Sequence, residues 1–222
     1  MVTGAAGALG SMAARTFARA GAKLLLADLS ADRLAALADE LRGQQGSEVV
    51  TGVVDVTDAD QVAGLVDRAA ELGAPVSVLL NNAGVPMSKT LMESTPDDWR
   101  RVFEANVIGT VVPTQACVRG MVRQGYGRIV NVSSITARTS VPQRCAYGAT
   151  KAAVSNMTQS FAVEFGGHGI TVNAIAPSAV VTDMNRDLLA SQPEVYRDLM
   201  AHTPVGRMCV ADDLAGVLLL LA

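Results

Sequence analysis

The sequence has few cysteines, no run of basic residues and no long apolar run. Its three cysteines, Cys117, Cys145 and Cys209, are odd in number, widely spaced and without a CxxC pair. Such a set favours neither a disulfide framework nor a zinc site, so we interpret them as free thiols in a reducing compartment and predict no metal. The net charge is −3, which leaves no electrostatic footprint for a nucleic-acid partner.

The apolar runs that do occur are short. The most apolar, GVLLLLA at 216–222, is far shorter than the ~20 residues that span a bilayer. We interpret the start of the sequence, which leads directly into the first motif, as lacking a secretory segment. We therefore expect a cytoplasmic protein that acts on a small molecule and has neither a membrane nor a nucleic acid as partner.

Short apolar runs alternate with longer amphipathic segments along the chain. One helical segment, at 30–43, begins with Ser30 as its N-cap and ends at a glycine. Near-continuous apolar strands separated by helices predict an α/β fold, a doubly wound parallel sheet with helices on both faces. No repeat or linker divides the chain, so we predict one domain over 1–222. The expected strands lie at 23–28, 47–56, 77–84, 127–134 and 169–177.

Polar residues gather where these strands end. In doubly wound sheets, ligands bind beyond the carboxyl ends of the strands, near the point where strand order reverses. This shared location predicts a ligand site and is more informative than any single motif. The clusters are Thr3 and Gly4, Asp28, Asp55, Asn81 to Gly84, Ser133 and Ser134, and Pro177 to Thr182.

The first cluster belongs to a glycine-rich turn, VTGAAGALG at 2–10, which opens a helical segment. Glycines let a backbone approach a pyrophosphate, whose charge is favoured at a helix N-terminus. A simple strand-to-helix turn explains the glycines equally well. Asp28 adds weight, because a carboxylate about 20 residues on accepts hydrogen bonds from a ribose 2′-hydroxyl and repels a 2′-phosphate. The alternative for Asp28 is a helix cap, although Ser30 already fills that position.

Tyr147 and Lys151 lie four residues apart at the expected start of a helix, in CAYGATKAAV at 145–154. Residues at i and i+4 share a helix face, so the two side chains can act together. The pair alone does not establish a function, because YxxxK is common by chance.

Taken in order, these motifs resemble those of the short-chain dehydrogenase/reductase family, from Val2 to the last residue. The resemblance implies a Rossmann-like fold, a nicotinamide cofactor, and hydride transfer between a secondary alcohol and its ketone. Ordered matches at the right spacing are far more specific than any one motif. They are the glycine-rich turn, Asp55 in DV, NNAG at 81–84, Asn106 in ANVIGT, Ser134 in NVSS, YGATK at 147–151, and VNAIAP at 172–177 followed by Thr182.

The resemblance implies catalytic roles for four side chains. Tyr147 is expected to be the general acid/base that exchanges a proton with the substrate oxygen, although a free tyrosine, with a pKa near ~10, is a poor base at neutral pH. Lys151 is expected to stabilise the phenolate and to hold the nicotinamide ribose. Ser134 is expected to hydrogen-bond the reacting oxygen, and Asn106 to hold a water that links Lys151 to solvent.

On the cofactor side, the resemblance together with Asp28 implies NAD. Asp55 and Val56 are expected to flank the adenine, while Val180 and Thr182 reach the nicotinamide carboxamide. The expected cofactor-binding set is Gly4, Gly7, Leu9, Gly10, Asp28, Leu29, Asp55, Val56, Asn82, Ala83, Gly84, Tyr147, Lys151, Val180 and Thr182.

The chain also departs from the family pattern. Ser178 stands where a glycine usually follows the proline, and serine tolerates a positive φ less well than glycine. The family's usual last strand is lacking, so the strand that contains TVNAIA at 171–176 is expected to be an exposed edge. On this interpretation the chain is either a fragment or dependent on a partner subunit.

We predict an NAD(H)-dependent oxidoreductase that interconverts a secondary alcohol and its ketone, with a sugar acid as substrate. TPVGR at 203–207 is similar to a segment of sugar-acid reductases such as gluconate 5-dehydrogenase. The alternatives are an enzyme like the 3-oxoacyl-carrier-protein reductases, which Asp28 disfavours, and a non-catalytic dinucleotide-binding fragment or interaction protein. The segments around Asn106 and Tyr147 resemble helices that pair between family subunits, so we expect a homo-oligomer, either dimer or tetramer.

Overall fold

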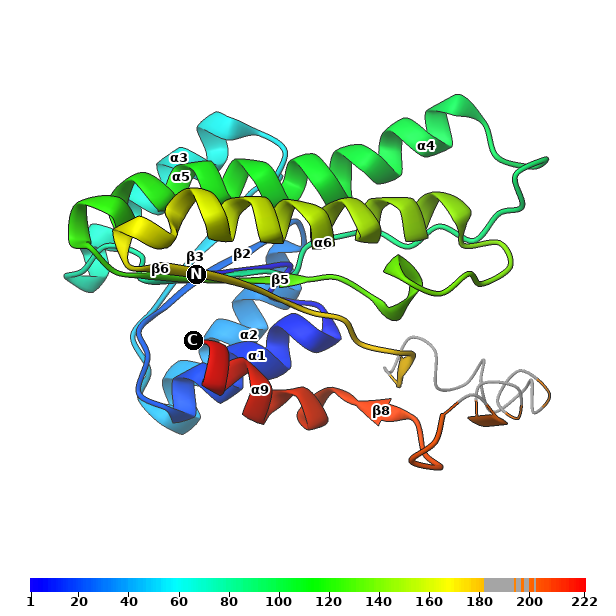
Figure 1. Cartoon of the computed structure of the whole chain (residues 1–222). Helices are drawn as coiled ribbons and strands as arrows, with labels where there is room; N and C mark the ends of the chain where they lie inside the picture. The colour runs from blue at the N-terminus through cyan, green and yellow to red at the C-terminus, as the bar shows by residue number, and fades with distance from the viewer. Residues whose placement is uncertain (182–193, 195–196, 198–199, 202) are drawn as a thin grey trace.

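A parallel sheet of six strands forms the centre of the computed structural model, which describes residues 1–181, 194, 197, 200–201 and 203–222 (Figure 1). The strands are β1 (Val2–Thr3), β2 (Leu24–Asp28), β3 (Val49–Val53), β4 (Val78–Asn81), β5 (Gly127–Val132) and β6 (Ile170–Ile175). Their order across the sheet is β3-β2-β1-β4-β5-β6, and every neighbouring pair is parallel. The order therefore reverses between β1 and β4, where a doubly wound sheet opens a crevice.

Helices cover both faces of the sheet, as the alternating pattern predicts. One face carries α1 (Ala8–Arg19), α2 (Ala31–Gln45) and α9 (Ala215–Leu221), and the other carries α3 (Ala59–Asp67), α5 (Gly109–Gln124) and α6 (Cys145–Phe165) (Figure 1). Successive residues of β2 feed the two cores in turn: Leu24 and Leu26 pack toward α1 and α2, while Leu25 and Ala27 pack toward α3 and α5. Both faces of the strand are buried, which explains its unbroken apolar sequence.

Shorter elements connect these layers and carry much of the site. They are η1 (Arg68–Leu72), α4 (Pro96–Phe103), the π-helical turn η2 (Glu104–Ile108), η3 (Ile135–Ala137), η4 (Gly166–His168) and η5 (Ala211–Leu214). A second sheet joins β7 (Val180–Val181) to β8 (Cys209–Val210) in parallel. In the main sheet β6 is an edge strand, as expected from the sequence.

The helix expected at 30–43 has Ser30 at its N-cap, as predicted, but ends later than expected. It continues past Gly43 to Gln45, and Gly46 closes it with a φ of +60°. Ser30 occupies the N-cap position but its side chain makes no capping hydrogen bond. Instead the Ser30 N–H donates to Asp28 Oδ1 at 3.0 Å. The Asp28 carboxylate therefore helps to fix the turn that leads into α2, the helix that the Ser30 side chain was expected to cap.

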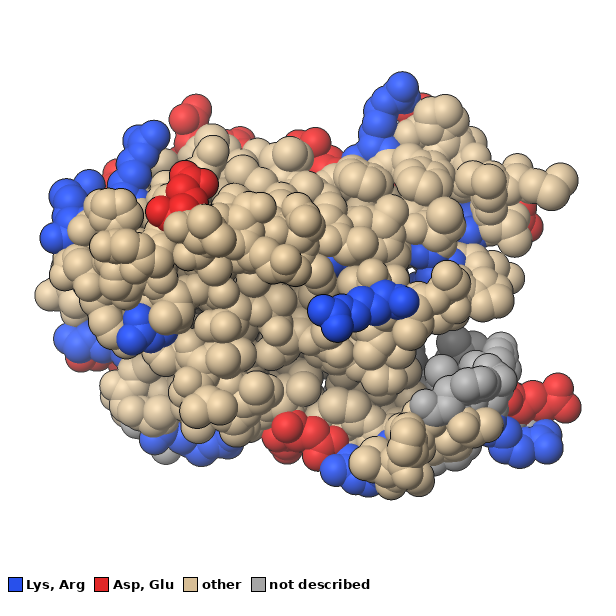
Figure 2. Space-filling view, viewed as in Figure 1, with Lys and Arg blue, Asp and Glu red and all other residues tan. Residues whose placement is uncertain are grey.

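Charged side chains of both signs are spread over the face of the molecule that Figure 2 shows. On this face they form no broad patch of one sign. Within the part of the chain that the structure describes, no helix is both long enough and apolar enough to cross a membrane.

Candidate active site

The glycine-rich turn lies between β1 and α1 and packs against the end of β4. Gly4 has a φ of +60°, and a Cβ at this position would lie 2.9 Å from the Ala83 Cα. A Cβ on Gly10 would lie 2.1 Å from the Gly4 carbonyl oxygen. On the other side, the Asn82 side-chain amide donates to the carbonyls of Thr3 and Gly4 at 3.1 and 3.0 Å. Close contacts that only glycine permits therefore hold the turn in one shape.

The start of α1 is free to receive an anion. Gly7 is its N-cap, and no side chain caps the first turn. That turn also contains no acidic residue, while Leu9 packs against the core beneath it. The first N–H groups of a helix have no partner within it, and the helix dipole adds to their attraction for negative charge. The uncapped amides and the close-packed glycines fit the pyrophosphate of a dinucleotide.

A pocket of about 380 Å³ opens beside this turn, at the carboxyl ends of β2, β3 and β4. Asp28 in its wall accepts hydrogen bonds from the Ala6 and Ser30 N–H groups at 2.9 and 3.0 Å. A carboxylate offers about four acceptor positions, so Asp28 retains capacity for a ligand hydroxyl. The expected cofactor residues that line this pocket are Gly4, Asp28, Leu29, Asp55, Val56, Ala83 and Gly84.

A larger hollow, of about 850 Å³, lies between α3 and α5. None of the expected site residues lines it. It lies along the sides of two helices, whereas the smaller pocket lies at the strand ends where ligands of this fold class bind. We therefore place the candidate site at the smaller pocket.

Tyr147 and Lys151 lie at the start of α6, beside the end of β5. The Lys151 Nζ is 5.7 Å from the centroid of the Tyr147 ring and donates a 2.8 Å hydrogen bond to the Val132 carbonyl. Lys151 is only 5 % exposed, and this burial lowers the pKa of its ammonium to about 8. Among the described residues its hydrogen-bond partner is a neutral carbonyl, and no carboxylate forms an ion pair with it.

Three influences act on the Tyr147 hydroxyl. Burial raises its pKa, while the nearby Ser134 hydroxyl and the positive charge of Arg144 oppose that rise. Ser134 is itself buried, and its Oγ accepts a 2.9 Å hydrogen bond from Thr136 Oγ1. The structure thus brings the expected serine, tyrosine and lysine together at one strand end.

Asn106 is fully buried in η2, the π-helical turn between α4 and α5. Its Oδ1 accepts the Val85 N–H at 2.7 Å, and its Nδ2 donates to the Val85 carbonyl and to Thr150 Oγ1. A Cβ on Gly84 would lie 2.9 Å from Asn106 Oδ1 and 3.7 Å from Lys151 Nζ. Asn106 therefore ties the loop after β4 to the helix that carries the lysine, and its expected role in holding a water stays a prediction.

Comparison with known proteins agrees with this geometry. The family model for short chain dehydrogenases matches residues 1–193. A 3-oxoacyl-acyl-carrier-protein reductase of Thermotoga maritima is 35% identical over 223 residues, covering 100% of this chain and 89% of that protein. Gluconate 5-dehydrogenase of Gluconobacter oxydans is 34% identical over 223 residues, covering 100% and 86%.

Solved structures give the same result. NAD⁺-bound xylitol dehydrogenase has a TM-score of 0.92 at 30% identity, covering 99% of this chain and 90% of that one. A gluconate 5-dehydrogenase from Burkholderia cenocepacia, in complex with NADP and tartrate, has a TM-score of 0.90 at 32% identity, covering 99% and 86%. The chain belongs to the short-chain dehydrogenase family. It is an oxidoreductase that acts on CH–OH groups, and the Rossmann-like fold predicted from its sequence is confirmed.

The last two expected cofactor residues of this short-chain dehydrogenase follow β6 in the sequence. Val180 is half-buried in β7 and pairs with Cys209 of β8. Thr182 lies outside the described residues. Among the described non-glycine residues only Gln143 has a positive φ, so Ser178 does not carry the strain expected of a serine in place of glycine.

Two structural roles in this dehydrogenase were missed by the sequence analysis. Thr3 Oγ1 accepts the N–H groups of Asn82 and Ala83 at 3.0 and 3.1 Å, which fixes the end of β4 to the glycine-rich turn. In the neighbouring strands, Asn81 Nδ2 donates to Asn131 Oδ1 at 2.9 Å, deep inside the sheet. Polar residues at otherwise apolar strand positions were the available signal, because most buried polar groups are hydrogen-bonded.

Proposed function

We propose that this dehydrogenase interconverts a secondary alcohol and its ketone, with NAD as the preferred cofactor. The convergence of Ser134, Tyr147 and Lys151 at the end of β5 carries the proposal. The pocket beside the glycine-rich turn lies at the same edge of the sheet. A proton donor and a dinucleotide pocket at one edge suit a reaction that moves a proton and a hydride.

In this proposal the chain's own residues move and stabilise the proton. A bound nicotinamide supplies or accepts the hydride. Tyr147 donates its hydroxyl proton to the substrate oxygen during ketone reduction and takes it back during alcohol oxidation. Because burial raises its pKa, Tyr147 is protonated at neutral pH and needs a nearby cation to act as a base. Lys151 supplies that charge, and Ser134 hydrogen-bonds the same oxygen.

The preference for NAD rests on Asp28. Its carboxylate is fixed by two backbone N–H groups, so it accepts ribose hydroxyls and repels a 2′-phosphate. The Arg33 side chain of α2 reaches the glycine-rich turn, where it donates to the Ala6 carbonyl. This guanidinium offers a phosphate some attraction, and solved relatives hold either NAD⁺ or NADP. We infer that the Asp28 carboxylate dominates, because it is anchored and lines the pocket, which Arg33 does not.

The substrate class we propose is a polyhydroxy acid or polyol. Support comes from relatives described as gluconate 5-dehydrogenases and from a structural neighbour that holds tartrate, a dicarboxylate. A 3-oxoacyl-carrier-protein reductase is the second candidate, favoured by the 35% identical relative. An assay with a 3-oxoacyl thioester separates the two.

Turnover should occur with NAD⁺ and a secondary alcohol, at a kcat/KM at least ~10-fold above that with NADP⁺, the effect of one anchored charge. The measurement is a spectrophotometric panel of gluconate, xylitol, galactitol and, in the reducing direction, acetoacetyl-CoA. Binding of NADH is followed separately by energy transfer from Trp99, the single tryptophan. Saturable NADH binding without turnover of any compound in the panel would contradict the proposed enzyme.

Replacing Asp28 by serine should shift the NAD-to-NADP preference by about 10- to 100-fold toward NADP. The substitution removes the repelling carboxylate and leaves Arg33 to attract the 2′-phosphate. The matched control is Asp32→Ser, which removes an exposed carboxylate from the first turn of α2 and should leave the preference unchanged. An equal shift in both variants would show that general surface charge, and not Asp28, sets the preference.

The proposal includes a cytoplasmic homo-oligomer, either a dimer or a tetramer. Exposed apolar side chains in the helical layer that contains α5 and α6 support it. Ile108 of η2 is 38% exposed and Val163 of α6 is 86% exposed. Such groups are stabilised when a second subunit covers them.

A further inference from the structure

Arg144 immediately precedes α6 and lies three positions before Tyr147. Its guanidinium carbon is 6.0 Å from the centroid of the Tyr147 ring, and the residue is half-buried. One N–H group donates to the Met87 carbonyl at 3.3 Å, a long hydrogen bond. A guanidinium has five N–H donors, so most of those on Arg144 have no partner among the described residues.

The backbone on both sides of Arg144 is held in place by the loop after β4. Gln143 has a φ of +64°, an unfavourable conformation for a residue with a side chain. Its carbonyl accepts the Lys89 N–H at 3.0 Å, and its Oε1 lies 3.2 Å from Ser88 Oγ. These tertiary contacts impose the conformation of Gln143, and they thereby fix the backbone position of Arg144.

A small apolar cluster fastens the same two segments. Met87 and Ala146 are both buried and pack with Val102 of α4. Tyr147 packs against this cluster as well. Arg144 thus projects from a fixed junction and places its guanidinium near the Tyr147 ring, in surroundings where apolar groups strengthen electrostatic interactions.

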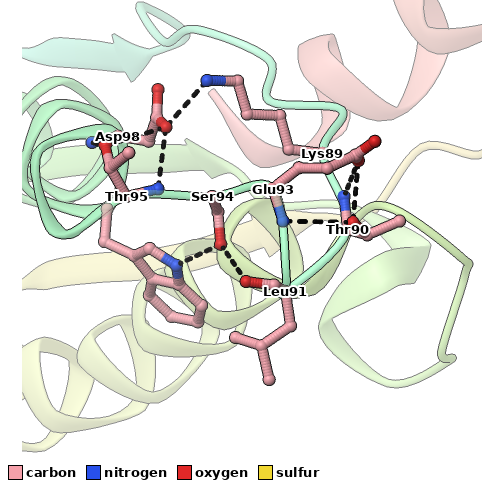
Figure 3. A network of polar contacts seen from close by, with 8 residues as sticks. Lys89, Thr90, Leu91, Glu93, Ser94, Thr95 and Asp98 are labelled. Carbon is pink, nitrogen blue, oxygen red and sulfur yellow. Dashed lines mark hydrogen bonds and ion pairs between the residues drawn. The ribbon is translucent and has the colours of Figure 1, made fainter.

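A second cation in the loop after β4, Lys89, already has a partner. Figure 3 shows its ammonium directed at Asp98, 2.8 Å from Oδ2. Lys89, together with the N–H and hydroxyl of Thr95, holds the pKa of Asp98 at about 2. Glu93 is likewise occupied, accepting from the Thr90 N–H and hydroxyl. Each charged side chain drawn in this network is therefore paired or hydrogen-bonded within the loop, in contrast to Arg144.

We propose that Arg144 binds the carboxylate of the substrate and thereby selects an acid over its neutral analogue. The inference rests on the proposed function and adds the residue that would set its substrate class. Guanidinium and carboxylate form two parallel hydrogen bonds, a geometry that an ammonium does not provide. The distance from Arg144 to Tyr147 suits a small hydroxy acid or keto acid whose anionic group lies a few bonds from the reacting carbon.

The experiment compares D-gluconate with D-glucitol, which has a CH₂OH group in place of the carboxylate. The wild type should prefer gluconate, and Arg144→Gln should reduce the ratio of the two kcat/KM values by about 10- to 100-fold. Glutamine keeps a donor for the Met87 carbonyl while removing the charge. Lys89→Gln is the matched control and should leave the ratio unchanged, because Asp98 already neutralises that ammonium. Arg144→Lys should restore only part of the preference.

A binding measurement makes the result independent of turnover. Tartrate should raise the melting temperature of the NAD⁺-saturated wild type and of Lys89→Gln, but not that of Arg144→Gln. An equal response in all three proteins, or in none, would overturn the role of Arg144. Equal losses of gluconate and glucitol turnover in Arg144→Gln would also overturn it, because the arginine would then act on the chemistry alone. Turnover of neutral alcohols without any preference for acids would reject this inference but not the proposed function. If no compound is turned over, the proposed function is rejected, and the tartrate measurement still tests the role of Arg144.

Discussion

Tyr147→Phe is expected to lower kcat by about 10³-fold, within the range for removing a general acid/base. The substitution deletes the hydroxyl that would exchange a proton with the substrate oxygen, and leaves the ring packed against the cluster of Met87, Val102 and Ala146. The pocket beside the glycine-rich turn contains no part of this ring, so NADH affinity should change much less than kcat, even with Tyr147 in the expected cofactor-binding set. Loss of rate with cofactor binding retained would assign the hydroxyl to the chemical step.

The measurement pairs steady-state turnover with an NADH titration. Tyr126→Phe serves as the control, since Tyr126 is 41% exposed, its ring lies under the Arg128 guanidinium, and it precedes β5, at the opposite end of that strand from the site. That variant should retain wild-type turnover. If Tyr147→Phe also retained it, the proposed acid/base would be wrong.

Lys151→Met is expected to lower kcat by at least ~10²-fold and, at the same time, to stabilise the fold. Activity falls because the cation that allows Tyr147 to lose its proton is gone. Stability rises because a buried, uncompensated ammonium is replaced by a side chain of similar length that needs no solvation. A pKa lowered from 10.5 to about 8 corresponds to a destabilisation on the order of 3 kcal/mol at neutral pH.

The pH dependence of stability tests the same lysine. Between pH 8 and 10.5 the unfolded chain keeps a proton on Lys151 that the folded protein has released, so the free energy of unfolding should rise with pH across this window. Below pH 8 both states are protonated and this contribution is constant. Urea unfolding at several pH values should therefore show a large stability difference between Lys151→Met and wild type at pH 7, which closes above pH 10.5. Lys23→Met changes a half-exposed lysine, and its stability difference from wild type should not depend on pH in this way. A stability difference that stays constant with pH in both variants would count against a buried charge at Lys151.

Much of this arrangement could be predicted because it follows from the strands. Parallel strands present their carboxyl ends at one edge, so polar residues that follow each apolar run had to meet there. Asp28, Asn82 and Ser134 are at that edge for this reason. The two glycine contacts at Gly4 and Gly10 likewise follow from a turn that must bring a helix start close to a strand end.

The remainder depends on tertiary contacts that have no local signature. The positive φ of Gln143 is imposed by hydrogen bonds from a loop more than fifty residues earlier in the chain, and nothing in its own sequence announces it. Asn106 reads as a poor helix former, yet its amide is satisfied by Val85 and Thr150, which lie in other elements. Arg144 looked like any charged loop residue, because its relation to Tyr147 depends on where Met87 accepts its hydrogen bond.

The π-helical turn η2 determines which surfaces α4 and α5 pack against. A wider turn accommodates more residues than an α-helical turn, and each residue advances an α-helix by about 100°. Helix α4 therefore directs Val102 at the loop beside Tyr147, while α5 directs Cys117 and Met121 into the core under the sheet. The π-helical turn changes which residues of the helix face a given direction. The contiguous helix formed by α4, η2 and α5 therefore packs against two differently oriented surfaces, and Asn106 lies in the turn between them.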